Sequence, residues 1–387
     1  MYDFLVIRRL YVHNFRCLEN FDLPIAGKSS ALLIGKNGSG KTTVGSALEI
    51  LQRIARGANR VGDLVKPMDL SHARNEVPMR FEIEVELGGN VYGYTIAFDY
   101  PEGFRELRVR EENLVVDGKP IYKREGAQVH LAKAGQETEA QFRVDWHLVG
   151  LPIIQEKSTN DPLFVFKQWL SRILILQPLP SLIDGESRDE TLQPNRQVTN
   201  FGAWFSGLLA HTPAAYARID NYLKDVFPDL KDIKNPLIGA EARSLSVHFS
   251  GERGSLTLPL GSLSDGEKCF MICALVLAAI DVYQPMVCFW DEPDNYLAID
   301  EVGHFILVLR KAFQAGSQFI ATSHNQETIS RFSDENTLYL YRNSHLEPTI
   351  VRSVSNLRAS GGVHGDLVNA LVRGDVGNAD QPSHERQ

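Results

Sequence analysis

The sequence contains no long hydrophobic run, few cysteines and no export signal. Its longest uninterrupted apolar segment, residues 269–280, is twelve residues long, which is too short to cross a bilayer. The first ten residues, MYDFLVIRRL, contain neither a leading basic stretch nor a small-residue cleavage site. The four cysteines lie among apolar neighbours without the paired spacing of a metal site (Cys17, Cys269, Cys273 and Cys288). We therefore expect a cytoplasmic protein with buried, reduced thiols, and we exclude membrane-spanning and secreted classes.

The chain also lacks heptad runs and internal repeats, so long coiled coils and repeat architectures are excluded. Its 387 residues are 43% hydrophobic and 23% charged, which is typical of a folded globular protein and not of a disordered one. A chain of this length accommodates one large α/β domain with an insertion, or two ordinary domains.

The net charge of −8 argues against a protein that coats nucleic acid through bulk attraction, but the charge is unevenly distributed. Residues 1–60 carry nine Lys/Arg against four Asp/Glu, a net +5, so the rest of the chain carries 31 against 44, a net −13. Positive charge at this end favours either a phosphate-binding lobe or a surface that faces nucleic acid. The charge count alone leaves both interpretations open.

Hydrophobic periodicity divides most of the chain into segments of different character. Residues 1–75 predict an N-terminal lobe of strands, a glycine-rich turn and an amphipathic helix over 41–56. Residues 76–150 alternate with period two between turn signals, which predicts an antiparallel β-rich insertion. Residues 151–240 predict a mostly helical insertion with a short strand at 173–176.

The remaining residues predict a second α/β unit and a polar tail. Residues 241–350 form the predicted C-terminal lobe, and residues 351–387 a C-terminal segment that is partly disordered. Helices are expected in this lobe over 265–283 and 300–315, and strands over 286–290, 318–322 and 337–341. The predicted fold class is therefore α/β.

Residues 35–42, GKNGSGKT, match the pattern G-x-x-x-x-G-K-[ST] between a predicted strand and a predicted helix. Glycines in such a loop let successive backbone N–H groups converge on phosphate oxygens, and the helix directs its positive end at the same anion. Lys41 is expected to reach the β- and γ-phosphates and Thr42 to ligate Mg²⁺. The residues expected to bind the nucleotide in this loop are Gly35, Asn37, Gly38, Ser39, Gly40, Lys41, Thr42 and Thr43.

A predicted strand over 287–290 ends in two carboxylates, Asp291 and Glu292. This placement suits a nucleotide site at the edge of a parallel sheet. Asp291 would hold Mg²⁺, and Glu292 would orient or deprotonate the attacking water. The alternative is a plain turn at the end of a strand, because Asp-Glu-Pro also begins loops well.

Two further elements lie in the C-terminal lobe. Residues 263–268, LSDGEK, precede a long apolar helix, and they are compatible both with a capping box and with an anion site at a helix N-terminus. Residues 319–324, FIATSH, are a predicted strand that ends in His324, and in this position the histidine can hydrogen-bond a γ-phosphate. A single histidine at a strand end often has no function, so this alternative also stays open.

These four elements, in this order, resemble the ATP-binding-cassette (ABC) class of ATPases. Residues 35–42 are similar to Walker A, 263–268 to the LSGGQ-type signature, 287–292 to Walker B with its catalytic glutamate, and His324 to the switch histidine. The Asn14-Phe15-Arg16 sequence and the LSxGE form of the signature resemble AAA-family ATPases of the SMC (chromosome-maintenance), RecF-type and OLD-type (overcoming lysogenisation defect) branch. The resemblance implies a P-loop NTPase fold, an ABC-type ATPase head with an inserted antiparallel β-meander and a helical segment.

The resemblance also implies ATP and Mg²⁺ as cofactors and a homodimer as the working unit. Ser264 and Gly266 of one subunit would close over the ATP held by Lys41 of the other, so that hydrolysis separates the pair. Gln177 is the expected glutamine that couples Mg²⁺ to the lobes, and Arg16 would either contact phosphate or brace the loop. The implied catalytic residues are Glu292, His324 and Lys41, and the implied metal ligands are Thr42, Asp291 and Gln177.

The sequence departs from these families in several places. Between Lys41 and Ser264 of the signature lie 222 residues, a longer separation than in transport cassettes, and Ala298 stands where the D-loop has an aspartate. Asp265 replaces the usual small residue of the signature. Without heptads, no coiled-coil arm is expected. Without an Asp-x-Asp in the 63 residues after His324, no Toprim nuclease domain is expected either.

The leading functional hypothesis is an ATPase that regulates a separately encoded effector, such as a nuclease or toxin of a bacterial anti-phage system. The alternative is a RecF-like repair ATPase that binds DNA, which the positive charge of residues 1–60 favours. Basic and acidic residues are balanced in the β-rich segment, which argues against this alternative. The subunit of a transporter is disfavoured by the spacing of the motifs.

Overall fold

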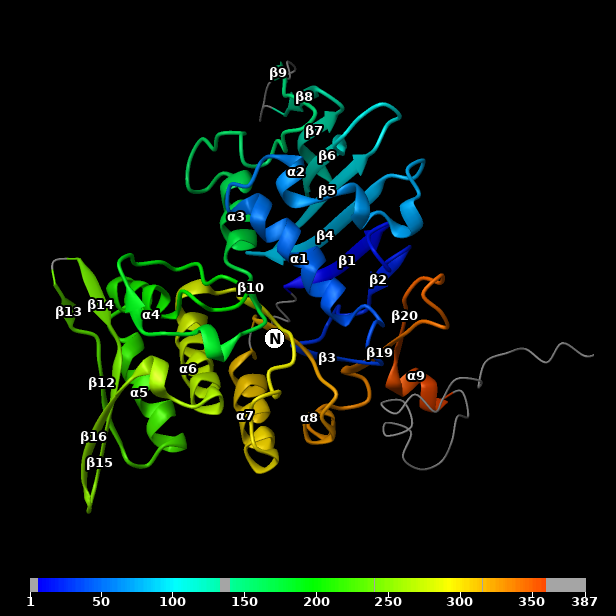
Figure 1. Cartoon of the computed structure of the whole chain (residues 1–387). Helices are drawn as coiled ribbons and strands as arrows, with labels where there is room; N and C mark the ends of the chain where they lie inside the picture. Colours follow the sequence, from blue (N-terminus) through cyan, green and yellow to red (C-terminus); the bar gives the residue numbers. More distant parts are fainter. Residues whose placement is uncertain (1–5, 133–139, 240, 315, 360–387) are drawn as a thin grey trace, which may run out of the picture. The chain divides into compact units, whose positions relative to one another are not determined.

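The computed structural model, drawn in Figure 1, describes residues 6–132, 140–239, 241–314 and 316–359. These residues fall into two compact units. One unit consists of the described residues of 6–171 and 322–359, and the other of those of 172–321. The sequence of the first unit is thus interrupted by the whole of the second. Most of the C-terminal segment predicted over 351–387 lies outside the described residues. Among the described helices, none is long and apolar enough to pass through a membrane.

The first unit contains an eight-stranded antiparallel sheet in the order β2-β1-β4-β5-β6-β7-β8-β9. Its strands are β1 (Ile7–His13), β2 (Phe21–Leu23), β4 (Met79–Leu87), β5 (Asn90–Asp99), β6 (Arg108–Val116), β7 (Lys119–Glu125), β8 (Gln128–Leu131) and β9 (Ala140–Arg143). The predicted period-two meander is confirmed, and the N-terminal strands β1 and β2 extend the same sheet.

One face of this sheet is buried because its strands alternate in sequence. Along β4, every second residue is buried, from Met79 to Leu87. Helix α3 (Pro162–Ser171) packs on the buried face through Phe166, whose ring centre lies 5.5 Å from that of Tyr94 and 6.1 Å from that of Tyr92. Helix α1 (Lys41–Ala55) contacts α3, and it confirms the helix predicted over 41–56.

A buried carboxylate on β6 forms hydrogen bonds with two other strands and with the segment that follows β9. Glu112 on β6 accepts hydrogen bonds from the phenols of Tyr94 and Tyr122 at 3.0 and 2.9 Å, and from the N–H groups of Gly150 and Leu151 at 2.7 and 2.8 Å. Burial, followed by the nearby Glu112 carboxylate, raises the pKa of both phenols well above the ordinary value. The network is satisfied by its own members, so it is a structural feature and not an open site.

A second group of strands in the first unit carries the glycine-rich loop. Strand β3 (Ser30–Ile34) pairs in parallel with β19 (Thr337–Tyr341), which pairs antiparallel with β20 (Ile350–Ser353). Every residue of β3 is buried, as expected for a parallel strand covered on both faces. Short helices complete the unit, namely α2 (Val61–Leu64), α8 (Gln326–Ser330), α9 (Val354–Ala359) and 3-10 turns at Pro67–Asp69 and Ser71–Ala73.

The second unit combines three parallel strands with helices and two small sheets. The parallel strands are β10 (Leu174–Leu176), β17 (Val287–Trp290) and β18 (Gln318–Thr322), and the helices are α4 (Phe201–His211), α5 (Ala215–Val226), α6 (Asp265–Tyr283) and α7 (Ile299–Ala312). One small sheet has the order β11-β14-β13, from Glu186–Ser187, Ala242–Ser244 and Leu237–Ile238. The other has the order β12-β15-β16, from Leu230–Lys234, Ser246–Gly251 and Gly254–Pro259.

Helix α6 explains the apolar run in the sequence. Residues 269–280 are buried on every side of the helix, so the run forms an internal helix of the second unit. The predicted buried thiols are confirmed, since all four cysteines are free and buried. Burial raises the pKa of Cys269 and of Cys273 to about 12 each, which makes both poor nucleophiles at neutral pH.

The mostly helical character predicted for residues 151–240 is only partly correct. Helices α3, α4 and α5 are present, but β11, β12 and β13 also lie in this stretch. Strand β12 exists because it pairs with β15, a contact between distant residues that local periodicity does not reveal.

Candidate functional site

The phosphate-type loop lies in the first unit, between β3 and α1. The buried strand ends at Ile34, and the helix begins at Lys41 with Gly40 as its N-cap, so residues 35–40 form the loop. Gly35, Gly38 and Gly40 all have positive φ, at 147°, 79° and 101°. This backbone conformation is strained for other residues, and it lets successive N–H groups turn to one side.

Two of these glycines are also required by close packing. A Cβ atom at Gly35 would lie 2.0 Å from the carbonyl oxygen of Leu340, and one at Gly40 would lie 2.8 Å from the hydroxyl of Thr349. Both neighbours come from the region of β19 and β20, at the far end of the sequence. The loop is therefore shaped by residues about three hundred positions away, as well as by its own glycines.

Lys41 is directed back across this loop. Its side chain is buried, with 6% exposed, and Nζ donates hydrogen bonds to the carbonyls of Gly35 at 2.7 Å and of Lys36 at 3.2 Å. The ammonium group is thus held over the backbone of the loop, beside which the resemblance implies that the β- and γ-phosphates bind. Thr42 is exposed at the start of α1, as a metal ligand must be, and Thr43 lies 3.7 Å from the thiol of Cys17.

Arg16 lies beside the same helix. Its guanidinium pairs with the carboxylate of Asp69 at 2.9 Å and donates to the hydroxyl of Ser46 at 3.4 Å, one turn after Thr42. The side chain is about half exposed. Neither contact reaches residues 35–40, so bracing of the loop and a contact with phosphate both stay predictions for Arg16.

His324 belongs to the first unit as well. The preceding residue, Ser323, donates its N–H to the carbonyl of Leu33, near the end of β3, at 3.3 Å. This bond places the histidine segment at the end of β3 where the phosphate-type loop begins. Asn325 then caps the short helix α8 by accepting a hydrogen bond from the N–H of Glu327 at 2.8 Å.

In the second unit, Asp291 and Gln177 lie at adjacent strand ends. Strands β10 and β17 are parallel, with Leu176 opposite Trp290, and the N–H of Asp291 donates to the carbonyl of Leu176 at 2.7 Å. The residues that follow the two strands therefore leave the sheet side by side. Gln177 is thus a neighbour of Asp291, the Walker-B-type aspartate.

Arg196 is a neighbour of both residues, and sequence reasoning missed it. Its carbonyl accepts the N–H of Gln177 at 2.8 Å, and its guanidinium lies 3.8 Å from the carboxylate of Asp291. The side chains of Arg196 and Asp291 are 13% and 2% exposed, so the pair is largely shielded from water. The positive charge of Arg196 therefore compensates part of the negative charge of the Asp291 carboxylate.

Glu292 has an unusual backbone conformation. Its φ is 51°, in the left-handed region that residues with side chains rarely adopt. The side-chain amide of Asn295 donates to the Glu292 carboxylate, and the N–H of Asn295 is 3.4 Å from the Glu292 carbonyl. Other residues outside the predicted site, such as Asp117 and Val198, share this backbone conformation, so the role of Glu292 as a catalytic carboxylate stays a prediction.

The signature-type segment of the second unit begins α6, and the capping box is present. Ser264 is the N-cap, its hydroxyl accepts the N–H of Glu267 at 3.3 Å, and the Glu267 carboxylate accepts the N–H of Ser264 at 2.7 Å. Ser264 and Asp265 are exposed, so the cap does not prevent contact with a second molecule.

Contacts within the second unit connect this segment to the other motifs. A Cβ atom at Gly266 would lie 3.0 Å from the carbonyl of Tyr296, and Nζ of Lys268 donates to the carbonyl of Pro180 at 3.0 Å. Tyr296 follows the Asp291–Glu292 pair, and Pro180 follows Gln177. The second unit therefore gathers Gln177, Asp291, Glu292, Ser264 and Gly266, while the first gathers Arg16, the phosphate-type loop and His324.

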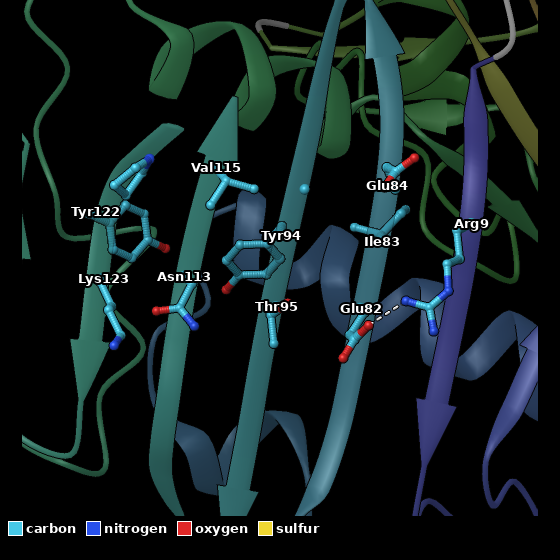
Figure 2. A pocket seen from close by; sticks show the side chains of 12 residues that line it. Arg9, Glu82, Ile83, Glu84, Tyr94, Thr95, Asn113, Val115, Tyr122 and Lys123 are labelled. Atoms are coloured by element: carbon cyan, nitrogen blue, oxygen red, sulfur yellow. Dashed lines mark hydrogen bonds and ion pairs between the residues drawn. The ribbon is translucent and has the colours of Figure 1, made fainter. Parts of the chain in front are cut away.

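A separate hollow lies on the sheet of the first unit. It has a volume of about 420 Å³, and Figure 2 shows Arg9, Glu82, Thr95, Asn113 and Lys123 across neighbouring strands. Gly93 leaves this part of the sheet without a side chain. Arg9 forms ion pairs with Glu82 and Asp22, so the charges are matched, and the hollow includes none of the predicted site residues.

Comparison with protein families identifies the chain. A family model described as "AAA domain, putative AbiEii toxin, Type IV TA system" matches residues 30–330, from β3 to α8. The chain belongs to this AAA family. The predicted recognition is confirmed: it is an AAA/ABC-type ATPase of the SMC/OLD kind.

Two curated relatives match shorter segments. The "Chromosome partition protein Smc" of Chlorobaculum tepidum is 36% identical over 109 residues, 27% of this chain and 9% of that protein. The "OLD nuclease" of Thermus scotoductus is 44% identical over 46 residues, 12% of this chain and 8% of that protein. The aligned part is thus less than a tenth of either relative, so their complete activities are not carried over to this chain.

Solved structures show the same fold. An Smc head bound to the C-terminal winged-helix domain of ScpA matches with a TM-score of 0.56 at 14% identity, over 92% of this chain and 99% of that one. An Smc head with an extended coiled coil, bound to the C-terminal domain of ScpA derived from Pyrococcus furiosus, matches with a TM-score of 0.53 at 12% identity. That match covers 92% of this chain and 98% of the other. The predicted P-loop, ABC-type head with its antiparallel meander and helical segment is therefore confirmed.

Proposed function

We propose that this protein binds ATP with Mg²⁺ at the loop of residues 35–42 and hydrolyses the bond to the γ-phosphate, which gives ADP and phosphate. The observation that carries the proposal is the buried Lys41 ammonium, held across a glycine-rich loop between a buried strand and a helix N-terminus. The loop fits a polyphosphate chemically. Ser39 Oγ is buried and has no hydrogen-bond partner among the described residues, so a phosphate oxygen would satisfy it.

The proposed roles follow from the chemistry of each side chain. Lys41 neutralises the β- and γ-phosphates, and Thr42, Asp291 and Gln177 hold Mg²⁺ directly or through water. Magnesium, when bound, supplies positive charge to the transferring phosphoryl group. Glu292 orients and deprotonates the attacking water, and His324 hydrogen-bonds the γ-phosphate.

The first experiment measures nucleotide binding and turnover separately. Purified protein is titrated with a fluorescent ATP analogue, and phosphate release is followed with and without Mg²⁺. His324→Ala is expected to lower kcat by about tenfold while the Kd for ATP stays unchanged, since the histidine acts on the charge that develops at the γ-phosphate. Equal kcat values for wild type and variant would show that the histidine is structural.

We propose further that ATP joins two copies of the chain, with Ser264 and Gly266 of one closing over the nucleotide of the other. The exposed serine at the start of α6 supports this role, because a helix N-terminus presents N–H groups to an anion. Glu292→Gln is expected to trap an ATP-bound dimer, which light scattering after size exclusion detects. A variant that stays monomeric with ATP·Mg²⁺ at high protein concentration would contradict the sandwich.

The effector is proposed to be a separately encoded nuclease or toxin of a bacterial defence system. The family description names a toxin and a toxin–antitoxin system, and one relative is an OLD nuclease. The four buried free thiols support the cytoplasm as the location of this chain. Affinity purification from the native host tests the proposal, with co-purification of a nuclease or toxin as the expected result.

DNA binding is the second candidate function. The net +5 of residues 1–60 and the likeness to a chromosome partition protein favour it, whereas the paired charges of the hollow around Arg9 do not. Duplex DNA affinity is measured between 50 and 200 mM salt, where a steep fall is the signature of phosphate contacts. Absent or salt-independent binding would exclude this function.

A further inference from the structure

The segment between β19 and β20, residues 342–349, lies against the phosphate-type loop, and we call it the β19–β20 arm. It contacts the loop with its first and last residues. The guanidinium of Arg342 donates to the carbonyl of Gly38 at 3.3 Å, and the hydroxyl of Thr349 donates to the carbonyl of Ser39 at 2.9 Å. Two consecutive carbonyls of the loop are therefore bonded to side chains from the other end of the sequence.

Thr349 fixes the direction of one peptide group. In a trans peptide the C=O and the following N–H point in opposite directions, so a carbonyl of Ser39 held by Thr349 directs the N–H of Gly40 to the other side. The threonine itself is 4% exposed, and its N–H donates to the carbonyl of Cys17 at 2.8 Å. The close approach of its hydroxyl to Gly40 leaves little room for the loop to shift.

Arg342 fixes the preceding peptide group in the same way. Its guanidinium also donates to the carbonyls of His345 at 2.6 Å and Glu347 at 2.8 Å, so the arm holds its own arginine in place. The N–H of Ser39, opposite the Gly38 carbonyl, donates inward to the carbonyl of Lys36 at 3.1 Å. The same Lys36 carbonyl also accepts a hydrogen bond from Nζ of Lys41. The turn over residues 36–39 is therefore bonded by Arg342 at the Gly38 carbonyl and by Lys41 at the Lys36 carbonyl.

We propose that Arg342 and Thr349 are positioning residues of the phosphate-binding loop. They bond its carbonyls from outside, so that its turn and the direction of the Gly40 N–H are set before the nucleotide arrives. This inference rests on the proposed function and deepens it, because it assigns part of the phosphate affinity to residues outside every motif. Ordering a flexible loop on binding costs free energy, and a loop that is already ordered avoids this cost. The contacts of Arg342 and Thr349 therefore increase the affinity for phosphates, although neither side chain touches them.

The test compares variants of the arm in the full chain. Thr349→Val keeps the shape but removes the hydroxyl, and Arg342→Ala removes the guanidinium. Each is expected to weaken binding of ATP and of pyrophosphate by about tenfold, the effect of one hydrogen bond whose loss leaves a carbonyl unsatisfied. Thr349→Ser and Arg342→Lys restore a donor and should recover most of the affinity. Asn343→Ala is the matched control, since this exposed residue of the arm bonds only to the side chain of Glu347 among the contacts of the described residues.

The outcomes separate this inference from the proposed function. If both Thr349→Val and Arg342→Ala bind ATP and pyrophosphate with wild-type affinity, the positioning role proposed for these two residues is overturned. If the wild-type protein binds ATP and pyrophosphate no better than Lys41→Ala does, the proposed nucleotide site itself is overturned. If Thr349→Val unfolds, as thermal denaturation would reveal, the pair Arg342→Ala and Arg342→Lys decides alone, because Arg342 is partly exposed and its loss leaves the core intact.

Discussion

The two units hold their motif residues by different means. In the first unit, the contacts that shape the phosphate-type loop are made to backbone carbonyls, those of Gly35, Gly38 and Ser39. In the second unit, the contacts are made to carboxylates, with Arg196 beside Asp291 and Asn295 bonded to Glu292. Hydrogen bonds to backbone carbonyls fix the conformation of the loop, and these carbonyls do not titrate with pH. Carboxylates, in contrast, can exchange one cation or hydrogen-bond donor for another. We therefore expect the phosphate-type loop of the first unit to determine nucleotide affinity, and the carboxylates of the second unit to determine turnover.

The largest expected effect is on turnover, from the second unit. Glu292→Gln is expected to lower kcat by about 10²- to 10⁴-fold, the usual contribution of a general base, with the Kd for ATP changed by less than about twofold. Single-turnover phosphate release and fluorescence titration measure the two quantities. Asp300→Asn, an exposed acid in the first turn of α7, is the matched control and should leave both unchanged. A loss of affinity equal to the loss of kcat would break the division between the units.

Lys41→Ala is expected to have the next largest effect, this time on affinity. Charged hydrogen bonds contribute about 1.5–3 kcal/mol, which predicts ATP binding about 10- to 150-fold weaker. Lys36→Ala is the control, because the exposed side chain of Lys36 plays no part in the contacts that its carbonyl makes. Isothermal titration with both variants checks the prediction. Similar losses in both would indicate that general positive charge, and not the loop, binds the nucleotide.

Arg196→Gln tests the carboxylate region of the second unit through the free energy of unfolding. Removing the arginine leaves Asp291 buried without its neighbouring charge, which should lower the free energy of unfolding in EDTA by about 3 kcal/mol. The affinity for ATP in EDTA should stay at the wild-type value, because the arginine belongs to the carboxylate region. Urea denaturation measures the first quantity, with the exposed Arg188→Gln as control. Unchanged stability would show that the Arg196–Asp291 pair contributes nothing.

The smallest expected effect separates the two roles left open for Ser264. Ser264→Ala removes the helix cap and should cost about 1 kcal/mol of stability. Ser264→Asp keeps a good capping residue but places a negative charge where the proposed partner's triphosphate would lie. It should therefore retain wild-type stability and fail to form the ATP-dependent dimer in light scattering. An ATP-dependent Ser264→Asp dimer would reduce the signature-type segment to a helix cap.

The parts of the fold that sequence predicted well are those with a local signal. Helices α1 and α6 begin at Lys41 and Asp265 as predicted, and β18 and β19 have the predicted bounds, because periodicity and flanking turns define them. The sequence could not reveal β11, β13 or β14, which have two or three residues each and exist only through pairing. The same limit applies to the candidate site. Arg196, Asn295, Arg342 and Thr349 match no motif, and three of them act on residues far away in sequence.

The parallel pairing of β3 with β19 has a consequence for how the protein is made. Residue 34 leaves the ribosome long before residue 339, its partner in the sheet, and at 5–20 residues per second the interval is roughly 15–60 s. During that time the future nucleotide loop has neither its neighbouring strand nor Arg342 and Thr349. A nascent or truncated chain should therefore be unable to hold ATP, so nucleotide capture would report that synthesis has passed residue 349.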